Sequence, residues 1–308
     1  MDALTEAPKS KPAADPLRLT RRRFLHAAAG TAFAAVALDG LLVDPQNVHA
    51  EDLTITLERL PAAFDGFRIA QLSDIHYGET IGDSYVHRAV EIANSFAPDM
   101  VVITGDFTTR SFTMRNPEEA ARRAEPCARV LTGLRSRLGT VAILGNHDVD
   151  TDPVIVTRAL ESNGIRMLNN EAYSIEQNAA RLWIAGLGDV FFGRQDLNAT
   201  MHNVPDDEAV IMLVHEPDYA DAVANFRRVD LQLSGHSHGG QVRVPGLGPI
   251  PFVLPYLGRK YINGLFHIRG AAGHLQLYTN RGLGTVGIPV RFNCTPEVTR
   301  ITLRSKRP

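Results

Sequence analysis

Short runs of consecutive apolar residues recur along the chain and are separated by stretches of helical character. Apolar runs of about four to eight residues, bounded by polar or turn residues, are typical of strands buried inside a sheet. We expect such strands at 67–72, 100–104, 141–144, 209–214 and 229–233, with strand-like segments around 168 and at 182–187. The intervening stretches predict helices at 84–96, 117–134 and 153–163.

This order of elements predicts a parallel core sheet. A strand, a helix and a second strand joined in sequence pair in parallel through a right-handed crossover. No low-complexity linker or internal repeat interrupts the pattern, so we expect a single α/β domain over 51–308. Beyond 240 the chain is rich in glycine and proline, and short alternating runs at 275–278 and 298–303 predict antiparallel strands.

The first fifty residues differ in character and predict a signal peptide or anchor over 1–50. Residues 20–25, Thr-Arg-Arg-Arg-Phe-Leu, resemble a twin-arginine signal, and an apolar run at 27–43 follows them. Asp39 and Gly40 interrupt this run, which falls short of the roughly 20 apolar residues that span a bilayer. Cleavage after Ala50 and retention as an uncleaved anchor both stay open.

A signal of this kind predicts a route and a destination. Twin-arginine export carries folded proteins, so the domain would fold before export. We expect the twin-arginine export machinery as a partner. The expected location is the periplasm, the cell wall or the outer face of the cytoplasmic membrane.

Composition adds one asymmetry to this picture. The chain has 308 residues, of which 44% are hydrophobic, and this suits one large or two small globular domains. Residues 51–239 hold 28 acidic and 16 basic side chains, whereas 240–308 hold ten basic ones and a single acid, Glu297. Such a segment suits an anionic substrate or a membrane surface, and basic side chains on solvated strand faces would explain it equally well. We expect no nucleic-acid partner, and we expect Cys127 and Cys294 to be small core residues.

Polar residues follow each of the clearest predicted strands. Open α/β sheets bind their ligands at the carboxyl ends of the strands. In chain order these polar segments are Asp74-Ile75-His76, Gly105-Asp106, Gly145-Asn146-His147-Asp148, His215 and Gly235-His236-Ser237-His238-Gly239-Gly240.

These residue types fit a site for two metal ions. A pair of divalent ions about 3.5–4 Å apart needs a bridging carboxylate with nitrogen and oxygen ligands around it. Imidazole with carboxylate suits Mn, Fe or Zn, whereas an all-oxygen set would suit Mg or Ca. Residues two apart in an extended segment face the same side, so Asp74 and His76 can share one ion. Glycines before Asp106, Asn146 and His236 allow close backbone approach.

Two other motifs in the sequence match known functional sites, but the chain lacks the elements that should follow each of them. Residues 235–239 match the G-x-S-x-G elbow of serine hydrolases. That fold needs a helix next and then an acid and a histidine, but the only later acid is Glu297 and no histidine follows it. Residues 282–287 match G-x-G-x-x-G, yet no strand–helix–strand unit follows, which excludes a dinucleotide site.

The order D-x-H, G-D, G-N-H-D, H and G-H-x-H resembles the calcineurin-like metallophosphoesterase family over 67–240. The resemblance implies a four-layer α/β/β/α sandwich and a hydrolase with two divalent ions. It implies that one ion is held by Asp74, His76 and His238, the other by Asn146, His215 and His236, and that Asp106 bridges them. It also implies that His147 is not a ligand but faces the substrate.

Details of the motifs narrow the resemblance. The Gly-Asp motif lacks the second acid of the protein-phosphatase branch, which counts against a protein phosphatase. The export signal and the segment Asn280-Arg281-Gly282-Leu283-Gly284 are similar to a small exported or membrane-associated bacterial branch. That branch is linked to phosphodiesters or lipid-linked pyrophosphates such as UDP-2,3-diacylglucosamine. A phosphomonoesterase of broad specificity and a non-catalytic metal-binding protein of the envelope remain alternatives.

The expected reaction is an in-line attack of hydroxide on phosphorus without a covalent enzyme intermediate. Two bound ions would lower the pKa of a bridging water toward about 7, and they and His147 would stabilise charge on the phosphoryl oxygens. Asp148 is expected either to orient His147 or to cap a helix. Three arginines are candidates for binding the substrate's phosphate, or else serve as structural or surface residues: Arg110, Arg243 and Arg281.

Overall fold

The structure, a computed structural model, describes Phe24, His26 and residues 46–78, 80–110, 114–251 and 253–306. The chain divides into two units, Met1–Leu38 and Asp39–Pro308. In the first unit the described residues, Phe24 and His26, are helical and exposed. The rest of the predicted signal motif and the apolar run at 27–43 lie outside the described residues. Within the described ranges, no helix is long and apolar enough to cross a membrane.

The first of two large sheets contains the predicted parallel core. Its strand order is β1-β14-β2-β3-β4-β5. The strands are β1 (His49–Leu57), β2 (Arg68–Leu72), β3 (Met100–Ile103), β4 (Thr140–Ala142), β5 (Arg166–Met167) and β14 (Glu297–Ser305). β2 to β5 are parallel, as the sequence predicted, while β14 is antiparallel to β2 and parallel to β1.

The second sheet has the strand order β12-β13-β9-β8-β7-β6. Its strands are β6 (Glu171–Gln177), β7 (Ala180–Gly186), β8 (Ala209–Leu213), β9 (Leu231–Ser234), β12 (Gly264–Gly270) and β13 (Gly273–Thr279). β13 is antiparallel to β12 but parallel to β9. The prediction of antiparallel strands beyond 240 is therefore right for the pairing of β13 with β12 and of β14 with β2. It is wrong for the pairing of β13 with β9 and of β14 with β1, which is parallel. β10 (Arg243–Val244) and β11 (Gly248–Pro249) form a short separate hairpin.

Helices lie at the three predicted positions, with one interruption, and three further helices that were not predicted lie at 146–151, 197–201 and 220–226. They are α2 (Asp83–Ser95), α3 (Pro117–Ala121), α4 (Ala124–Leu131), α5 (Asn146–Thr151), α6 (Pro153–Ser162), α7 (Leu197–Met201) and α8 (Ala220–Phe226), with 3₁₀ turns η3 (Ala62–Phe64), η4 (Pro217–Tyr219) and η5 (His238–Gly240). The single helix expected at 117–134 is two helices. Pro126 lacks the N–H that a continuous helix would need, and proline is tolerated only in a helix's first turn, where it lies in α4.

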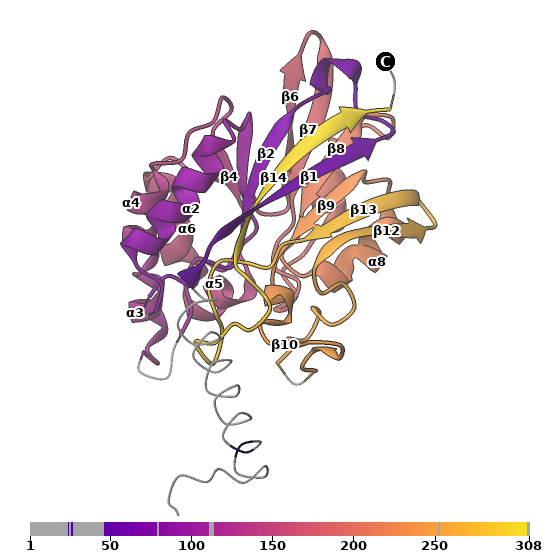
Figure 1. Ribbon diagram of the computed structural model, residues 1–308. Coiled ribbons are helices and arrows are strands. Elements are labelled where there is room, and N and C mark those ends of the chain that lie inside the picture. The colour runs from indigo at the N-terminus through magenta and orange to yellow at the C-terminus, as the bar shows by residue number, and fades with distance from the viewer. Residues whose placement is uncertain are drawn as a thin grey trace, which may run out of the picture. The chain divides into compact units, whose positions relative to one another are not determined.

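Three hydrophobic clusters separate four layers. One packs α2, α4 and α6 against the outer face of the first sheet, a second lies between the two sheets, and a third packs α8 against the second sheet. Side chains of β2 alternate accordingly, with Ile69 between the sheets and Ala70 and Leu72 under the helices. Figure 1 shows α2, α4 and α6 on one side of the sheets and α8 on the other. The predicted α/β/β/α arrangement is confirmed.

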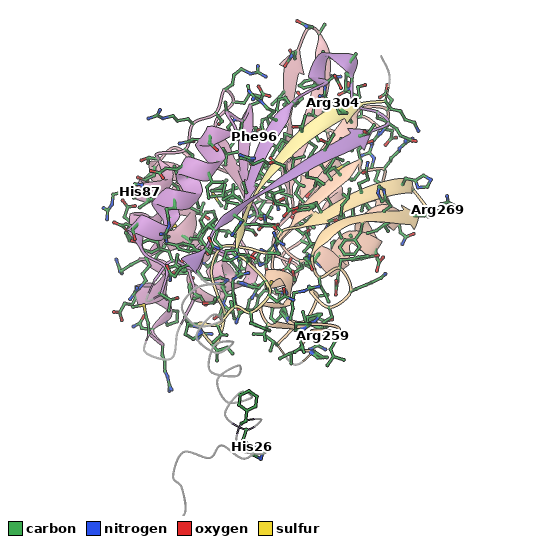
Figure 2. All side chains as sticks on the ribbon, in the orientation of Figure 1. His26, His87, Phe96, Arg259, Arg269 and Arg304 are labelled. Atoms are coloured by element: carbon green, nitrogen blue, oxygen red, sulfur yellow. The ribbon has the colours of Figure 1, made fainter. Side chains whose placement is uncertain are left out.

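The basic C-terminal segment is largely tied to distant acids. Its ion pairs on β14 and just beyond join Arg300 to Asp52, Arg304 to Asp65 and Lys306 to Glu58. Figure 2 shows the labelled Arg259, Arg269 and Arg304 on different sides of the domain. These cations therefore offset acids near the start of the domain and are spread over its strand faces and loops. Cys127 and Cys294 are both buried and unpaired, as expected for core residues.

Candidate metal centre

The polar segments predicted from the strand ends lie together where the two sheets meet. Contacts between the two sheets fix this meeting: the His236 N–H donates to the Asp74 carboxylate at 3.0 Å, and Nδ1 of His215 lies 2.6 Å from the Thr104 carbonyl. Glycine is needed at the contacts. A Cβ on Gly145 would lie 2.3 Å from Oδ1 of Asp106, and one on Gly235 would lie 2.2 Å from Oδ2 of Asp74. The close approach expected of these glycines is thus confirmed.

The backbone at this meeting point is strained. Residues other than glycine rarely adopt positive φ angles. Five residues of the predicted ligand set have φ angles between 48° and 67°: Asp74, His76, Asp106, His236 and His238. Such conformations persist only where surrounding structure fixes them, and they concentrate at functional sites. The strain turns these side chains toward one another.

Asp74, His76 and His238 form the first group of candidate ligands. All three are buried, and their ligand atoms lie within 4.8 Å of one another. The two Nε2 atoms of His76 and His238 are 3.1 Å apart, and Nε2 of His238 is 3.4 Å from Oδ1 of Asp74. Nδ1 of His238 is 3.2 Å from the Gly284 carbonyl, to which it donates when Nε2 is free to bind a metal.

The second group consists of Asp106, His215 and His236, again buried and within 4.8 Å. Nδ1 of His215 is 2.6 Å from the Thr104 carbonyl, which leaves Nε2 facing the site. Nε2 of His236 is 2.7 Å from the Tyr256 carbonyl, so its Nδ1 is the free ligand atom. Asn146, the first residue of α5, lies buried beside this group, next to Gly145.

Asp106 lies between the two groups. Its Oδ2 is 3.1 Å from Nε2 of His215 in its own group and 3.6 Å from Nε2 of His76 in the other. Its Oδ1 accepts a hydrogen bond of 2.9 Å from the His147 backbone N–H. One carboxylate oxygen therefore faces ligands of both groups, as a bridge between two ions requires.

Unsatisfied atoms test whether these residues fit metal ions. Nine polar side-chain atoms of the described residues are buried without a hydrogen-bond partner, and three of them belong to the predicted ligand set: Nδ1 of His76, Oδ1 of Asn146 and Nε2 of His215. Buried polar atoms normally find one, because an unmade bond costs about 1–3 kcal/mol. Nε2 of His215 and Oδ1 of Asn146 are good ligands for the metals expected from the sequence, and the facing nitrogens of His76 and His238, 3.1 Å apart, lie close enough to bind one cation. The donor set fits two divalent ions.

Protonation favours metal binding at four of the ligands but opposes it at His215, because the Asp106 carboxylate outweighs burial and raises the pKa of His215 well above its usual value. Burial lowers the pKa of His76 well below its usual range and lowers the pKa of His236 and of His238 to about 4, so these imidazoles are neutral. Burial opposes ionisation of Asp106, but His215 outweighs it and holds the pKa of Asp106 well below its usual value. Neutral imidazole and ionised carboxylate are the forms that bind metals.

His147 lies beside the first group without joining it. Its ring centroid is 5.0 Å from that of His76, with the rings nearly perpendicular. Nδ1 of His147 is 2.9 Å from Oγ1 of Thr109, a contact that the sequence did not reveal. When the Thr109 hydroxyl donates to Nδ1 of His147 rather than to the Arg110 carbonyl 3.2 Å away, the imidazole proton stays on Nε2, the form that can donate to a phosphoryl oxygen.

Changing Thr109 to valine is therefore expected to lower kcat for a phosphodiester about tenfold, the smaller end of the effect of losing such an orienting partner. KM should change little, because Thr109 acts through His147 rather than on the substrate. Steady-state kinetics with the Thr109→Ser variant as the matched control check this, since serine keeps the hydroxyl. Equal kcat values for the valine and serine variants would remove Thr109 from this role.

Asp148 supports the backbone rather than the His147 ring. Its carboxylate accepts hydrogen bonds of 2.8–3.0 Å from the backbone N–H groups of Asp106, Phe107, Thr108 and Gly145. The last of these bonds, from the Gly145 N–H, caps the N-terminus of α5. These contacts agree with the helix-capping alternative and not with a bond to His147. Burial, followed by the charge of Asp106, raises the pKa of Asp148 to about 7.

The three arginines that the sequence offered for binding the substrate's phosphate have different surroundings in the structure. Arg110 lines a cavity beside the metal centre but forms two hydrogen bonds of 2.6 Å to Asp150. Arg243 donates to the Gly239 carbonyl and to Oδ1 of Asn263. Arg281 pairs with Glu297 and Glu51. The contacts of the last two are those of structural arginines, the alternative that the sequence left open.

Sequence reasoning missed Arg291, which lies behind the centre. It is 0% exposed and is among the largest fully buried side chains described. Its guanidinium donates to the carbonyls of Arg281, Gly282, Gly284 and Cys294. Its Nη2 also lies 3.5 Å from Nδ1 of His238. No sequence signal separates such an arginine from a surface one, since arginine is mostly exposed.

A cavity of about 580 Å³ opens beside the first group of ligands. His76 and His147 are among the residues that line it, together with arginines and apolar side chains. A space of this size accommodates a small-molecule substrate.

A four-layer α/β sandwich with two adjoining groups of Asp and His ligands defines a metal-dependent phosphoester hydrolase. The family description "Calcineurin-like phosphoesterase" matches residues 67–240. The chain belongs to this family.

Similar proteins span nearly the whole chain. The uncharacterised metallophosphoesterase YkuE of Bacillus subtilis is 31% identical, covering 94% of this chain and 99% of that protein. Phosphodiesterase YaeI of Escherichia coli is 30% identical, covering 92% of this chain and 99% of that protein. A transmembrane protein with a metallophosphoesterase domain from Danio rerio is 31% identical, covering 88% of this chain and 61% of that protein.

Proposed function

We propose that this hydrolase cleaves phosphodiester or pyrophosphate bonds with two divalent ions. In this proposal Asp74, His76 and His238 hold one ion, and the second is held by Asn146, His215 and His236, with Asp106 shared. The single observation that supports it most is the position of Asp106, whose Oδ2 faces histidines of both groups. When bound, such a pair supplies hydroxide at neutral pH and withdraws charge from phosphoryl oxygens.

The protein's own residues position the substrate and handle its charge. His147 lines the cavity and lies close to His76, so its Nε2–H would donate to a phosphoryl or leaving-group oxygen. Thr109 holds the His147 ring, and Asp148 fixes the backbone that carries Asp106. His147 is the residue of this group that would touch the substrate, and the other two are positioning residues.

The size and lining of the cavity support a diester rather than a small monoester. Besides His147, the cavity is lined by apolar side chains, Val286 and Pro289, and by arginines. A second substituent on phosphorus would occupy this space, and a lipid-linked pyrophosphate such as UDP-2,3-diacylglucosamine is one substrate of that form. The name of the similar YaeI, a phosphodiesterase, points the same way.

Metal-loaded protein is expected to hydrolyse bis(p-nitrophenyl) phosphate faster than p-nitrophenyl phosphate, and chelation should abolish both activities. The measurement is release of p-nitrophenol after reconstitution with Mn²⁺, with the EDTA-treated protein as control. Preference for the monoester would favour a phosphomonoesterase. Binding of metal without turnover of either ester from mildly acidic to mildly alkaline pH would favour a non-catalytic metal-binding protein and end the proposal.

We also propose export through the twin-arginine machinery to the periplasm, the cell wall or the outer face of the cytoplasmic membrane. The support is the sequence of 20–25 and the apolar run after it. The mature domain would start near Glu51, within β1. Fractionation of cells that express the full chain tests this, with Arg21 and Arg22 changed to lysine in the control. Unchanged export of that variant would argue against the proposed route.

A further inference from the structure

The cavity beside the metal centre carries more positive charge than one phosphate group needs. Arg110, Arg115 and Arg123 all line it, and no aspartate or glutamate is among the described residues that do so. Of the three, Arg110 has its charge offset by the two bonds to Asp150. In the described ranges, neither Arg115 nor Arg123 is paired with a carboxylate.

Arg123 is held in place without being neutralised. Its side chain is half-buried, and its Nε donates weakly to Sδ of Met114 at 3.2 Å. On the other side it packs against Gly78, where a Cβ would lie 3.3 Å from Nη1. A guanidinium offers five N–H donors in a planar fork that matches phosphate or carboxylate. Most of these donors stay available to a ligand in the cavity.

Arg115 faces the same space as His147. Both residues line the main cavity, and both also line an adjoining one of about 390 Å³. Arg115 is exposed at this rim. A substrate whose scissile phosphate contacts His147 would therefore extend toward Arg115 and Arg123 with one of its substituents.

We propose that Arg115 and Arg123 form a subsite for a second anionic group, carried on a substituent of the scissile phosphate. The inference rests on the proposed function, since it places the scissile phosphate at the metal centre and His147. The substrate class is a phosphodiester or pyrophosphate that carries a further phosphate or carboxylate. Apolar residues on the same walls, Tyr77 and Val286 among them, contact the part of the substituent between the two charges.

Binding of two nucleotides that differ by one phosphate tests the subsite directly. Calorimetry on the Mn²⁺-loaded protein compares thymidine 3′,5′-bisphosphate with thymidine 5′-monophosphate. We expect the bisphosphate to bind about tenfold more tightly, the size of one charge-assisted hydrogen bond. Changing Arg115 and Arg123 together to alanine should reduce this ratio to near one.

Arg122 supplies the matched control. It is an exposed arginine beside Arg123 that pairs with Glu118 at 3.8 Å and lies outside the cavity lining. The Arg122→Ala variant should keep the tenfold ratio. Equal binding of the two nucleotides by the unchanged protein, or a full ratio in the double variant, would overturn the subsite.

A kinetic comparison separates this inference from the proposed function. The p-nitrophenyl 5′-phosphodiester of thymidine, with and without a 3′-phosphate, reports the same preference as a lower KM for the doubly charged ester. If the protein hydrolyses neither ester yet keeps the binding ratio, the proposed function fails and the subsite stands. If it hydrolyses both with equal KM and shows no binding ratio, the subsite fails and the function stands.

Discussion

Replacing Asp106 with asparagine is expected to lower kcat/KM for a phosphodiester by on the order of 10³-fold. The carboxylate faces both groups of ligands, 3.1 Å from Nε2 of His215 and 3.6 Å from Nε2 of His76. Asparagine keeps the shape but loses the charge that two cations share. Several kcal/mol of charge stabilisation depend on such a pair, and each 1.36 kcal/mol is about tenfold in rate. Steady-state kinetics and elemental analysis of bound metal are the measurements.

Two controls separate loss of the bridge from loss of the fold. The amide oxygen of asparagine can still accept the bond from the His147 backbone N–H, while the charged contact with His215 is lost. The metal-free variant should therefore keep the far-ultraviolet circular dichroism of the unchanged protein and unfold at a lower denaturant concentration. Asp150→Asn removes another acid near the cavity, one that pairs with Arg110, and should lower activity less than tenfold. Full activity of Asp106→Asn with two bound ions would show that Asp106 is not the bridge.

The convergence of the site was predictable because its signals are local. An apolar strand followed by Asp, Asn or His is visible in a short window of sequence, and parallel strands bring their carboxyl ends to one edge. Asp74, Asp106 and Asn146 follow β2, β3 and β4 in this way, while His215 and His236 follow β8 and β9 of the second sheet. That the two sheets face each other came from the resemblance to the family, not from the pattern.

The contacts behind and around the site were not predictable from such windows. Thr109 meets His147 across 38 positions, and Arg291 meets His238 across 53. Which arginine lines the cavity depends on how loops pack, so Arg123 was missed while Arg281, which pairs with Glu297, was a candidate. Long-range side-chain contacts leave no periodic trace in the sequence.

Arg291→Leu is expected to destabilise the metal-free protein by about 3 kcal/mol or more. The change removes the donor that serves four backbone carbonyls, and a buried acceptor without a partner costs about 1–3 kcal/mol. The same segment supports Asp74, because the Leu283 N–H donates to the Ser73 carbonyl and the Gly284 N–H to that of Asp74. Chemical denaturation of the EDTA-treated protein measures the loss.

The effect of Arg291 on metal affinity has two opposing parts. Its positive charge near His238 disfavours a cation in the first group of ligands, whereas its bonds to the Gly284 carbonyl hold His238 and Asp74 in position. We expect the effect of holding His238 and Asp74 in position to outweigh the effect of the charge, because partners of metal ligands typically contribute about 10–100-fold in metal affinity. Arg291→Leu should then weaken metal binding at least tenfold in a chelator competition.

Arg291→Lys distinguishes the two parts. Lysine keeps the charge but has a single nitrogen, which cannot serve four carbonyls at once. If position dominates, both variants bind metal more weakly than the unchanged protein, and lysine recovers only part of the stability. Tighter metal binding by the leucine variant would instead show that the buried charge, rather than the carbonyl contacts, sets the affinity of the first group.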